Sequence, residues 1–112
     1  MSGTGAQAEE QALRFLLDHG LKLKARNYRC RMGEIDLILL EGKTLVFVEV
    51  RMRRNRAFGG AAESITHSKR ARVLAAARHY LAGKQPTPAC RFDALLIEAD
   101  GAPLWIKDAF GE

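Results

Sequence analysis

Hydrophobic and polar positions are patterned most clearly between Gly33 and Arg51. Two apolar runs, IDLILL at residues 35–40 and LVFVEV at residues 45–50, flank the polar residues EGKT. A glycine followed by a polar residue between two such runs is typical of a two-residue type II′ turn. The pattern therefore predicts a β-hairpin with Gly42 and Lys43 at its turn.

The turn also sets which residues of the two strands face each other. If Glu41 pairs with Thr44, counting back along both strands places Asp36 opposite Glu49, and Glu34 opposite Arg51. Side chains of a strand alternate between the two faces of the sheet. One face is then expected to carry Glu34, Asp36, Phe47, Glu49 and Arg51. The other face is expected to carry Ile35, Leu37, Leu39, Val46, Val48 and Val50.

The predicted register brings two carboxylates close together. Directly opposed residues have Cβ atoms roughly 4.5–5.5 Å apart, and at an effective dielectric near 20 two negative charges there repel by about 3 kcal/mol. Mg²⁺ and Mn²⁺ bind carboxylate oxygens and waters, so a divalent cation would make the pair favourable. Asp36 and Glu49 are therefore candidate metal ligands. The alternative is that one acid binds a proton or an arginine, and a one-residue slip of register would separate the two.

Helical and strand periodicities elsewhere predict one α/β domain over residues 1–112 with the element order α-β-β-β-α-β-β and a mixed sheet of about five strands. The helix between the third and fourth strands predicts a right-handed crossover, so those two strands should be parallel. The remaining expected elements are a helix from about Gly5 to His19, a strand from Leu21 to Cys30, a helix from Ser64 or Thr66 to about Ala82, and strands at Arg91–Ala99 and Leu104–Lys107.

Two charged residues lie on or beside the apolar stripes of the predicted helices. Glu9 borders the stripe of the first helix, either as a first-turn acid favoured by the helix dipole or as a further metal ligand. Lys69 begins the stripe of the second helix and is expected to point toward the sheet, unless its long side chain extends to the solvent.

The net positive charge of the chain suggests a polyanionic partner. The chain carries a formal charge of +5, which is typical of proteins that bind polyanions such as nucleic acid, although many basic proteins bind none. The segment RMRRNR from Arg51 to Arg56, followed by AFGG, could bind phosphates or be an ordinary solvated loop. The candidate nucleic-acid-binding residues are Arg31, Arg53, Arg54, Arg56, Lys69 and Arg70.

Several classes of protein are not indicated. No apolar run reaches the 18 or more residues of a membrane span, and the start of the chain, MSGTGAQAEEQ, has no signal-peptide pattern. Cys30 and Cys90 lack the spacing of a zinc or redox motif. We expect a cytoplasmic protein with no membrane association.

The motifs together resemble one family across essentially the whole chain. They are RNYRCRMGEIDLI from Arg26 to Ile38, VFVEVR from Val46 to Arg51, Phe58-Gly59, Lys69, and RFD from Arg91 to Asp93. These match the YraN family (uncharacterised protein family 0102), which resembles the restriction-endonuclease-like PD-D/E-x-K nucleases and, among them, the archaeal Holliday-junction resolvases. The resemblance implies a three-layer sandwich with helices flanking the sheet, and a homodimer.

Carried over by position, the resemblance makes Asp36 the first metal-binding acid and Glu49 the second. Glu9 matches the acid that such resolvases carry on the first helix, and Glu34 is the family's own companion acid. Arg51 stands where the superfamily motif has lysine. Since arginine stays charged, Arg51 could stabilise transition-state charge but could not be a general base. Lys69 is a candidate substitute in space.

The leading hypothesis is an endonuclease dependent on Mg²⁺ or Mn²⁺ that hydrolyses DNA phosphodiester bonds. Its catalytic residues would be Asp36, Glu49, Arg51 and Lys69, and its metal ligands Glu9, Glu34, Asp36 and Glu49. No element for reading base edges is evident, so any selectivity should be for shape, such as branched DNA. Two alternatives stay open: a non-catalytic DNA-binding module with a vestigial site, and a protein-interaction partner of a recombination or segregation complex.

Overall fold

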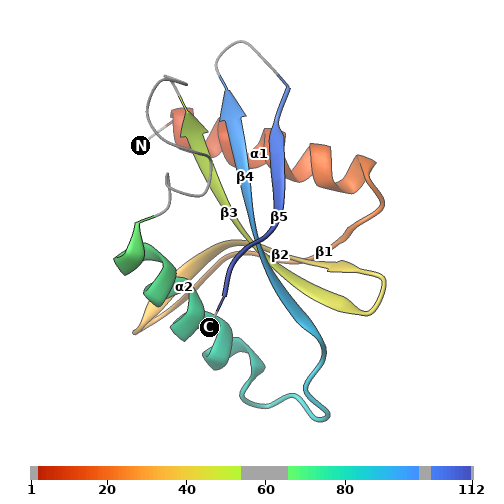
Figure 1. Ribbon diagram of the computed structural model, residues 1–112, viewed down its shortest axis with the longest axis vertical. Helices are drawn as coiled ribbons and strands as arrows, with labels where there is room; N and C mark the ends of the chain where they lie inside the picture. The colour runs from red at the N-terminus through yellow and green to blue at the C-terminus, as the bar shows by residue number, and fades with distance from the viewer. Residues whose placement is uncertain (1–2, 54–65, 99–101, 112) are drawn as a thin grey trace.

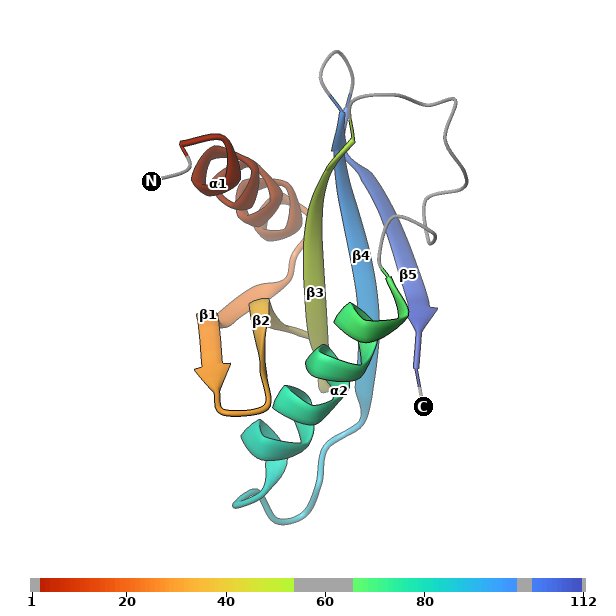
Figure 2. The ribbon, with the colours of Figure 1, turned by 90° about the vertical axis from the view of Figure 1, so that its left-hand side faces the viewer.

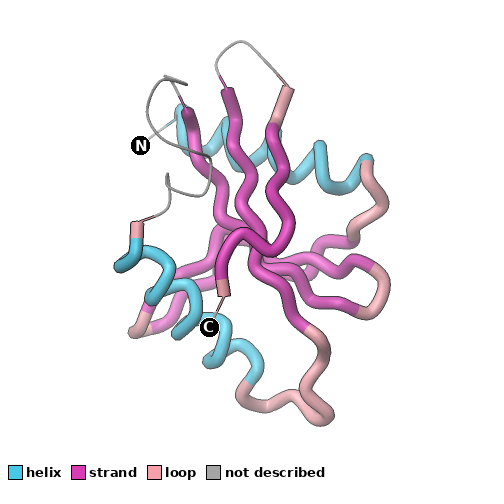
Figure 3. The backbone as a smooth tube through the Cα atoms, in the orientation of Figure 1, coloured by secondary structure: helices cyan, strands magenta, loops and turns pink. Residues whose placement is uncertain are grey.

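Five strands form one sheet in which every strand lies beside its neighbours in the sequence. The computed structural model describes residues 3–53, 66–98 and 102–111. The strand order is β1-β2-β3-β4-β5, and one helix lies on each side of the sheet (Figures 1 and 3). The elements are α1 (Gly3–Asp18), β1 (Lys22–Cys30), β2 (Gly33–Glu41), β3 (Thr44–Arg53), α2 (His67–Leu81), β4 (Cys90–Glu98) and β5 (Leu104–Phe110). The predicted element order and mixed sheet are confirmed.

The central hairpin has the predicted register. β2 and β3 are antiparallel, and Glu41 pairs with Thr44 across the turn. Gly42 has a φ of 63°, whereas the φ of Lys43 is not positive. A positive φ at the first central residue alone fits a type II′ turn, whereas type I′ needs it at both. The Gly-Lys turn thus fixes the alignment of the two strands.

The crossover also agrees with the prediction. β3 and β4 are parallel, and α2 lies between them in the chain. Thr66 caps α2, since its Oγ1 accepts a hydrogen bond from the backbone N–H of Lys69 at 3.2 Å; Ser64, the other expected cap, lies outside the described residues. β5 extends to Phe110 instead of ending at Lys107, because Asp108 adopts a φ of 56° and the ladder to β4 resumes after a shift of register.

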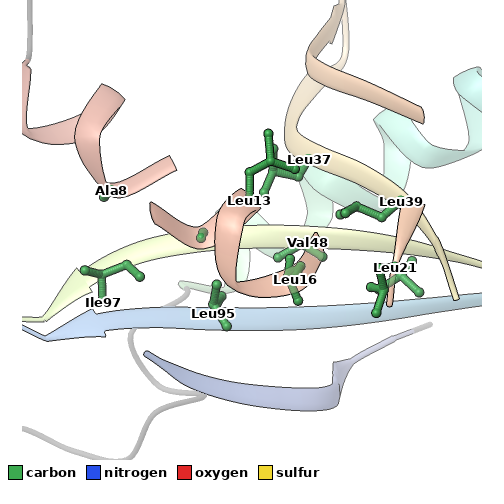
Figure 4. Packing of buried hydrophobic residues seen from close by; sticks show 11 residues of the cluster. Ala8, Leu13, Leu16, Leu21, Leu37, Leu39, Val48, Leu95 and Ile97 are labelled. Carbon is green, nitrogen blue, oxygen red and sulfur yellow. The ribbon is translucent and has the colours of Figure 1, made fainter. Parts of the chain in front are cut away.

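The two faces of the sheet are covered by different helices. α1 packs on one face, where Ala12 and Leu16 are fully buried in a cluster with strand residues such as Leu37 and Val48 (Figure 4). α2 packs on the other face, where Val73 belongs to a cluster that contains Ile38 and Phe47. Each fully buried Leu, Val or Phe side chain stabilises the fold by about 1.5–3 kcal/mol. The two helices and the sheet between them form three layers, which fix the positions of the side chains on both faces of the sheet.

Ile35 does not face the same side as Leu37, and this prediction was wrong. Ile35 packs in the α2 cluster, whereas Leu37 packs in the α1 cluster. The described ladder between β2 and β3 ends at the pair Leu37–Val48. The ladder to β1 continues in the same register from Arg26–Leu37 to Tyr28–Ile35, and Asn27 between them has a φ of 50°. Strict alternation therefore fails where β2 separates from β3. Figure 2 shows the connected ends of β1 and β2 standing apart from β3.

Gly33 fixes this divergent end of β2 against α2. A Cβ atom at Gly33 would lie 2.2 Å from the backbone oxygen of Arg72, so only glycine permits this approach. The start of β2 and the first turns of α2 are therefore in direct backbone contact. No helix among the residues that the structure places is both long and apolar enough to cross a membrane.

Candidate active site

Asp36 and Glu49 meet where β2 and β3 separate. They occupy the next position beyond the last ladder pair, Leu37–Val48. The backbone N–H of Val50 donates to Asp36 Oδ2 at 2.9 Å, and the backbone N–H of Asp36 donates to Glu49 Oε2 at 3.2 Å. Each carboxylate thus accepts a hydrogen bond from the backbone of the opposite strand. The predicted juxtaposition of these two acids is confirmed.

Glu49 is held in an unfavourable environment for a negative charge. Its side chain is fully buried, and burial followed by the nearby charge of Asp36 raises its pKa to about 8. Its second oxygen, Oε1, has no hydrogen-bond partner. Burial also raises the pKa of Asp36, although the Val50 N–H and the charge of Lys69 oppose that change. The charge of Lys69 and the backbone N–H of Asp36 offset only part of the rise in the pKa of Glu49.

Lys69 reaches this pair from the first turn of α2. Its Nζ lies 3.4 Å from Glu49 Oε1 and 3.9 Å from Glu34 Oε2. The first contact is an ion pair, and it lowers the pKa of Glu49 against the effect of burial. The lysine side chain is 21% exposed, so it is largely covered. The prediction that Lys69 points toward the sheet is confirmed.

Glu34 and Glu9 flank the pair without joining it directly. Glu34 lies opposite Arg29 of β1 and forms an ion pair with it at 3.5 Å, and the described ladder of β2 and β3 does not extend to a Glu34–Arg51 pair. That part of the predicted register was wrong, because the two strands have already diverged. Glu9 projects from α1, where partial burial and then the charge of Asp36 raise its pKa. A hydrogen bond with the side chain of Asn27 partly offsets this rise.

Arg51 follows Glu49 on the same strand and on the same face. Its side chain is half-buried, and its Nε is a buried donor without an acceptor. Its charge lowers the pKa of Asp36, so the guanidinium is close enough to act on the acidic pair. Two buried atoms of the site, the acceptor Glu49 Oε1 and the donor Arg51 Nε, are therefore without a hydrogen-bond partner.

The other arginines predicted to bind nucleic acid are placed only in part. Arg31 is exposed in the turn between β1 and β2, and Arg70 is half-buried on α2. Arg53 ends β3. Arg54 and Arg56 lie outside the described residues. The arginine-rich segment as a whole therefore remains a prediction.

The described side chains do not form a ready-made metal cage. Within residues 3–53, 66–98 and 102–111, no three His, Cys, Asp or Glu side chains converge as such a group. The structure brings together Asp36 and Glu49, attaches Glu34 to them through Lys69, and places Glu9 within reach of their charge. The donors available at the centre are thus two carboxylates.

Asn27 is the site residue that the sequence did not indicate. It combines a left-handed φ of 50° with a side-chain hydrogen bond to Glu9, at the point where β2 leaves β3. Asparagine tolerates this conformation better than most residues, but an asparagine inside a strand pattern carries no such signal by itself.

Asp93 is a structural residue and not part of this site. Its fully buried carboxylate accepts hydrogen bonds at 2.9 Å from Arg91 Nε, Arg91 Nη2, Trp105 Nε1 and the backbone N–H of Asp108. Arg91 and Asp93 thus also form a salt bridge. Asp93 therefore joins β4 to β5.

Comparison with known proteins identifies relatives of the same length. The model of the uncharacterised protein family UPF0102 matches residues 8–97, a range that contains every acid described above. A UPF0102 protein of Nitrosospira multiformis is 57% identical over 108 residues, covering 95% of this chain and 91% of the relative. A UPF0102 protein of Nitrosomonas eutropha is 55% identical over 108 residues, with 96% and 93% covered. One from Psychromonas ingrahamii is 49% identical over 109 residues, with 96% and 89% covered.

Proposed function

This chain belongs to the uncharacterised protein family UPF0102, whose description names no reaction, and we propose from the geometry of its acidic site that it is an endonuclease dependent on Mg²⁺ or Mn²⁺. Its substrate would be the phosphodiester backbone of DNA, including branched DNA. Asp36 and Glu49 would hold the cation, with Glu9 and Glu34 as further donors.

The observation that carries this proposal is the pairing of Asp36 with the fully buried carboxylate of Glu49. The carboxylate is fully buried, lies beside Asp36 and has a pKa raised to about 8, so its environment disfavours the charged form. A divalent cation between the two acids would reverse that balance. Perturbed acids of this kind cluster at functional sites, and a purely structural hairpin does not require them.

The donors fit a magnesium or manganese ion although no third acid converges on them. Mg²⁺ keeps several waters and is commonly held by one or two carboxylates together with substrate phosphates. Two carboxylates are what the centre of the site offers. When bound, such a cation would supply the Lewis acidity that phosphodiester hydrolysis needs.

Two cationic side chains would act on the substrate. Arg51 has a buried Nε–H without an acceptor, and a phosphate oxygen is the partner that a guanidinium binds best. Since arginine remains protonated, it would stabilise the developing charge and would not accept a proton. Lys69 carries the second positive charge, 3.4 Å from Glu49 Oε1.

Charge supports nucleic acid as the substrate. The whole chain carries +5, and Arg29 and Arg31 are exposed at the end of the hairpin that also carries Glu34. Phosphate contacts of this kind position a nucleic acid without reading its sequence. Selectivity would therefore depend on the shape of the DNA.

The test is cleavage of linear and branched DNA in Mn²⁺ or in EDTA by the wild type, Asp36→Asn and Glu49→Gln. We expect metal-dependent cleavage that falls by roughly 100-fold or more in either variant, because each loses a charged ligand. Glu10→Gln is the matched control, since Glu10 is an exposed acid paired with Arg26. Cleavage that survived both site substitutions would remove the proposal.

A DNA-binding module without catalysis is the second candidate. The contact between Lys69 and Glu49 favours it, since part of the negative charge is already compensated without a metal. Such a protein would bind DNA equally well in EDTA, and neither Asp36→Asn nor Glu49→Gln would weaken that binding. The same reactions, followed by gel shift, separate the two functions.

A further inference from the structure

The ammonium group of Lys69 forms an ion pair with Oε1 of Glu49. Nζ lies 3.4 Å from that oxygen and 3.9 Å from Glu34 Oε2. The position of the lysine in the first turn of α2 is fixed by the Thr66 cap, whose Oγ1 accepts the Lys69 backbone N–H at 3.2 Å. The fold therefore aims one flexible cation at the oxygen that the proposed metal would need.

We propose that Lys69 is a built-in counter-cation that a divalent ion must displace from Glu49, after which its ammonium is free to bind the substrate phosphate. This inference rests on the proposed function and concerns the regulation of the same site. It assigns Lys69 two successive partners, a carboxylate in the metal-free protein and a phosphate in the loaded one.

Competition follows from the chemistry of the shared oxygen. A lysine ammonium and a hard divalent ion both seek carboxylate oxygens, and two cations at one buried oxygen repel each other strongly where the dielectric is low. The contact of Lys69 with Glu49 is an ion pair at 3.4 Å, so what a divalent ion would replace is chiefly its charge compensation. The side chain is also 21% exposed, which leaves a route for its tip toward the solvent.

The lysine is suited to this exchange where an arginine would not be. An ammonium is a compact charge on four flexible methylene groups, so it can change partners by rotating its side chain. Arg51 of β3 has a planar guanidinium, which the proposed function already assigns to the substrate phosphate. The positive charge of Lys69 would thus offset the repulsion between the carboxylates of Asp36 and Glu49 until the metal and the DNA bind.

The first test is calorimetric titration of Mg²⁺ into the wild type, Lys69→Met and Lys43→Met. Lys69→Met keeps the length of the side chain without its charge, and Lys43 is an exposed lysine in the turn between β2 and β3. The titrations are made at about pH 9, above the pKa of about 8 of Glu49. We expect Lys69→Met to bind Mg²⁺ about tenfold more tightly than the wild type, and Lys43→Met to match the wild type.

The second test locates the ammonium directly and does not depend on a variant. A crystal of the wild type soaked in Mn²⁺ should show an anomalous peak at Asp36 and Glu49, with Lys69 Nζ moved out of ion-pair distance from Glu49. If metal binds while Lys69 keeps its contact, and Lys69→Met binds Mg²⁺ no more tightly, the exchange is overturned and the proposed function stands. If neither protein binds metal at Asp36 and Glu49, the proposed function itself fails.

Discussion

Asp36 and Glu49 are each held by the backbone of the strand that carries the other. The N–H of Val50, next to Glu49, donates to Asp36 Oδ2 at 2.9 Å, while the N–H of Asp36 donates to Glu49 Oε2 at 3.2 Å. Two side chains thereby bind the backbone of the opposite strand just beyond the last ladder pair, Leu37–Val48. The other oxygen of Glu49, Oε1, forms an ion pair with Lys69 at 3.4 Å.

The stability of the metal-free protein should reflect the proton on Glu49. Its pKa is about 8 in the folded chain against an ordinary 4.5, so the folded state binds this proton more tightly than the unfolded state does. The stability gained is fully present below about pH 4.5 and is lost as the pH rises to about 8. We therefore expect the melting temperature of the wild type in EDTA to fall across this window relative to Glu49→Gln.

Glu41 is the control for this pH dependence, because its contribution to stability changes with pH in the opposite direction. The hydrogen bond from Arg91 lowers the pKa of Glu41, so its contribution is present above the unfolded pKa and is lost as the pH falls. Glu41→Gln should therefore differ from the wild type most at neutral pH and least in acid. A constant difference between Glu49→Gln and the wild type from pH 4.5 to pH 8 would contradict the assignment.

Substitution of Gly33 should destabilise the divergent end of the hairpin. In Gly33→Ala the new Cβ would lie 2.2 Å from Arg72 O and 3.0 Å from Arg72 Cβ, so α2 or β2 must move. We expect a loss of about 1–3 kcal/mol in the free energy of unfolding, measured by urea denaturation. Gly83→Ala is the matched control, because nothing lies within 4 Å of its added Cβ. Equal stabilities of the two variants would show that the close approach is absent in solution.

Removal of the Asp93 carboxylate should cost more than removal of an exposed acid. Asp93→Ala leaves the buried donors of Trp105 and Asp108 without their acceptor and breaks a salt bridge to Arg91. We expect a loss of about 3 kcal/mol in the free energy of unfolding. Glu10→Ala breaks only the exposed pair with Arg26, and should cost less than about 1 kcal/mol. A similar, small loss in both variants would contradict the role of Asp93 in joining β4 to β5.

The unpartnered donor of Arg51 should be visible in the salt dependence of DNA binding. If its guanidinium binds a phosphate, Arg51→Gln removes one ionic contact and reduces the slope of log K against log salt by about 1. The measurement is fluorescence anisotropy of labelled DNA in EDTA at several salt concentrations. Lys43→Gln removes the same charge at an exposed turn and should leave the slope unchanged. Equal slopes for the wild type and Arg51→Gln would exclude the contact.

Much of the fold could be predicted because its signals are local. The Gly42-Lys43 turn fixes the alignment of β2 with β3, and Thr66 marks the start of α2 through its side-chain cap. The length of β5 could not be predicted, because its continuation past Lys107 depends on Asp108, whose backbone N–H donates to Asp93 on the neighbouring strand.

Only the part of the candidate site that lies within the β2–β3 hairpin could be predicted from the sequence. The pairing of Asp36 with Glu49 follows from counting residues from the turn, but the same count placed Glu34 opposite Arg51, which fails because β2 and β3 separate. At this end of β2, Asn27 of the neighbouring β1 has a φ of 50° and Gly33 lies against the backbone of α2. Neither is visible in the two strands themselves.

The sequence by itself determined that two acids occur at facing positions of a hairpin, since the alternation of a strand and the geometry of a tight turn involve only neighbouring residues. Only the tertiary structure decided that Glu49 is fully buried, that α2 places Lys69 3.4 Å from it and that α1 brings Glu9 within range of the charge of Asp36. The physical reason is that desolvation and Coulomb interactions depend on which distant segments cover a side chain, and a strand pattern does not encode that cover.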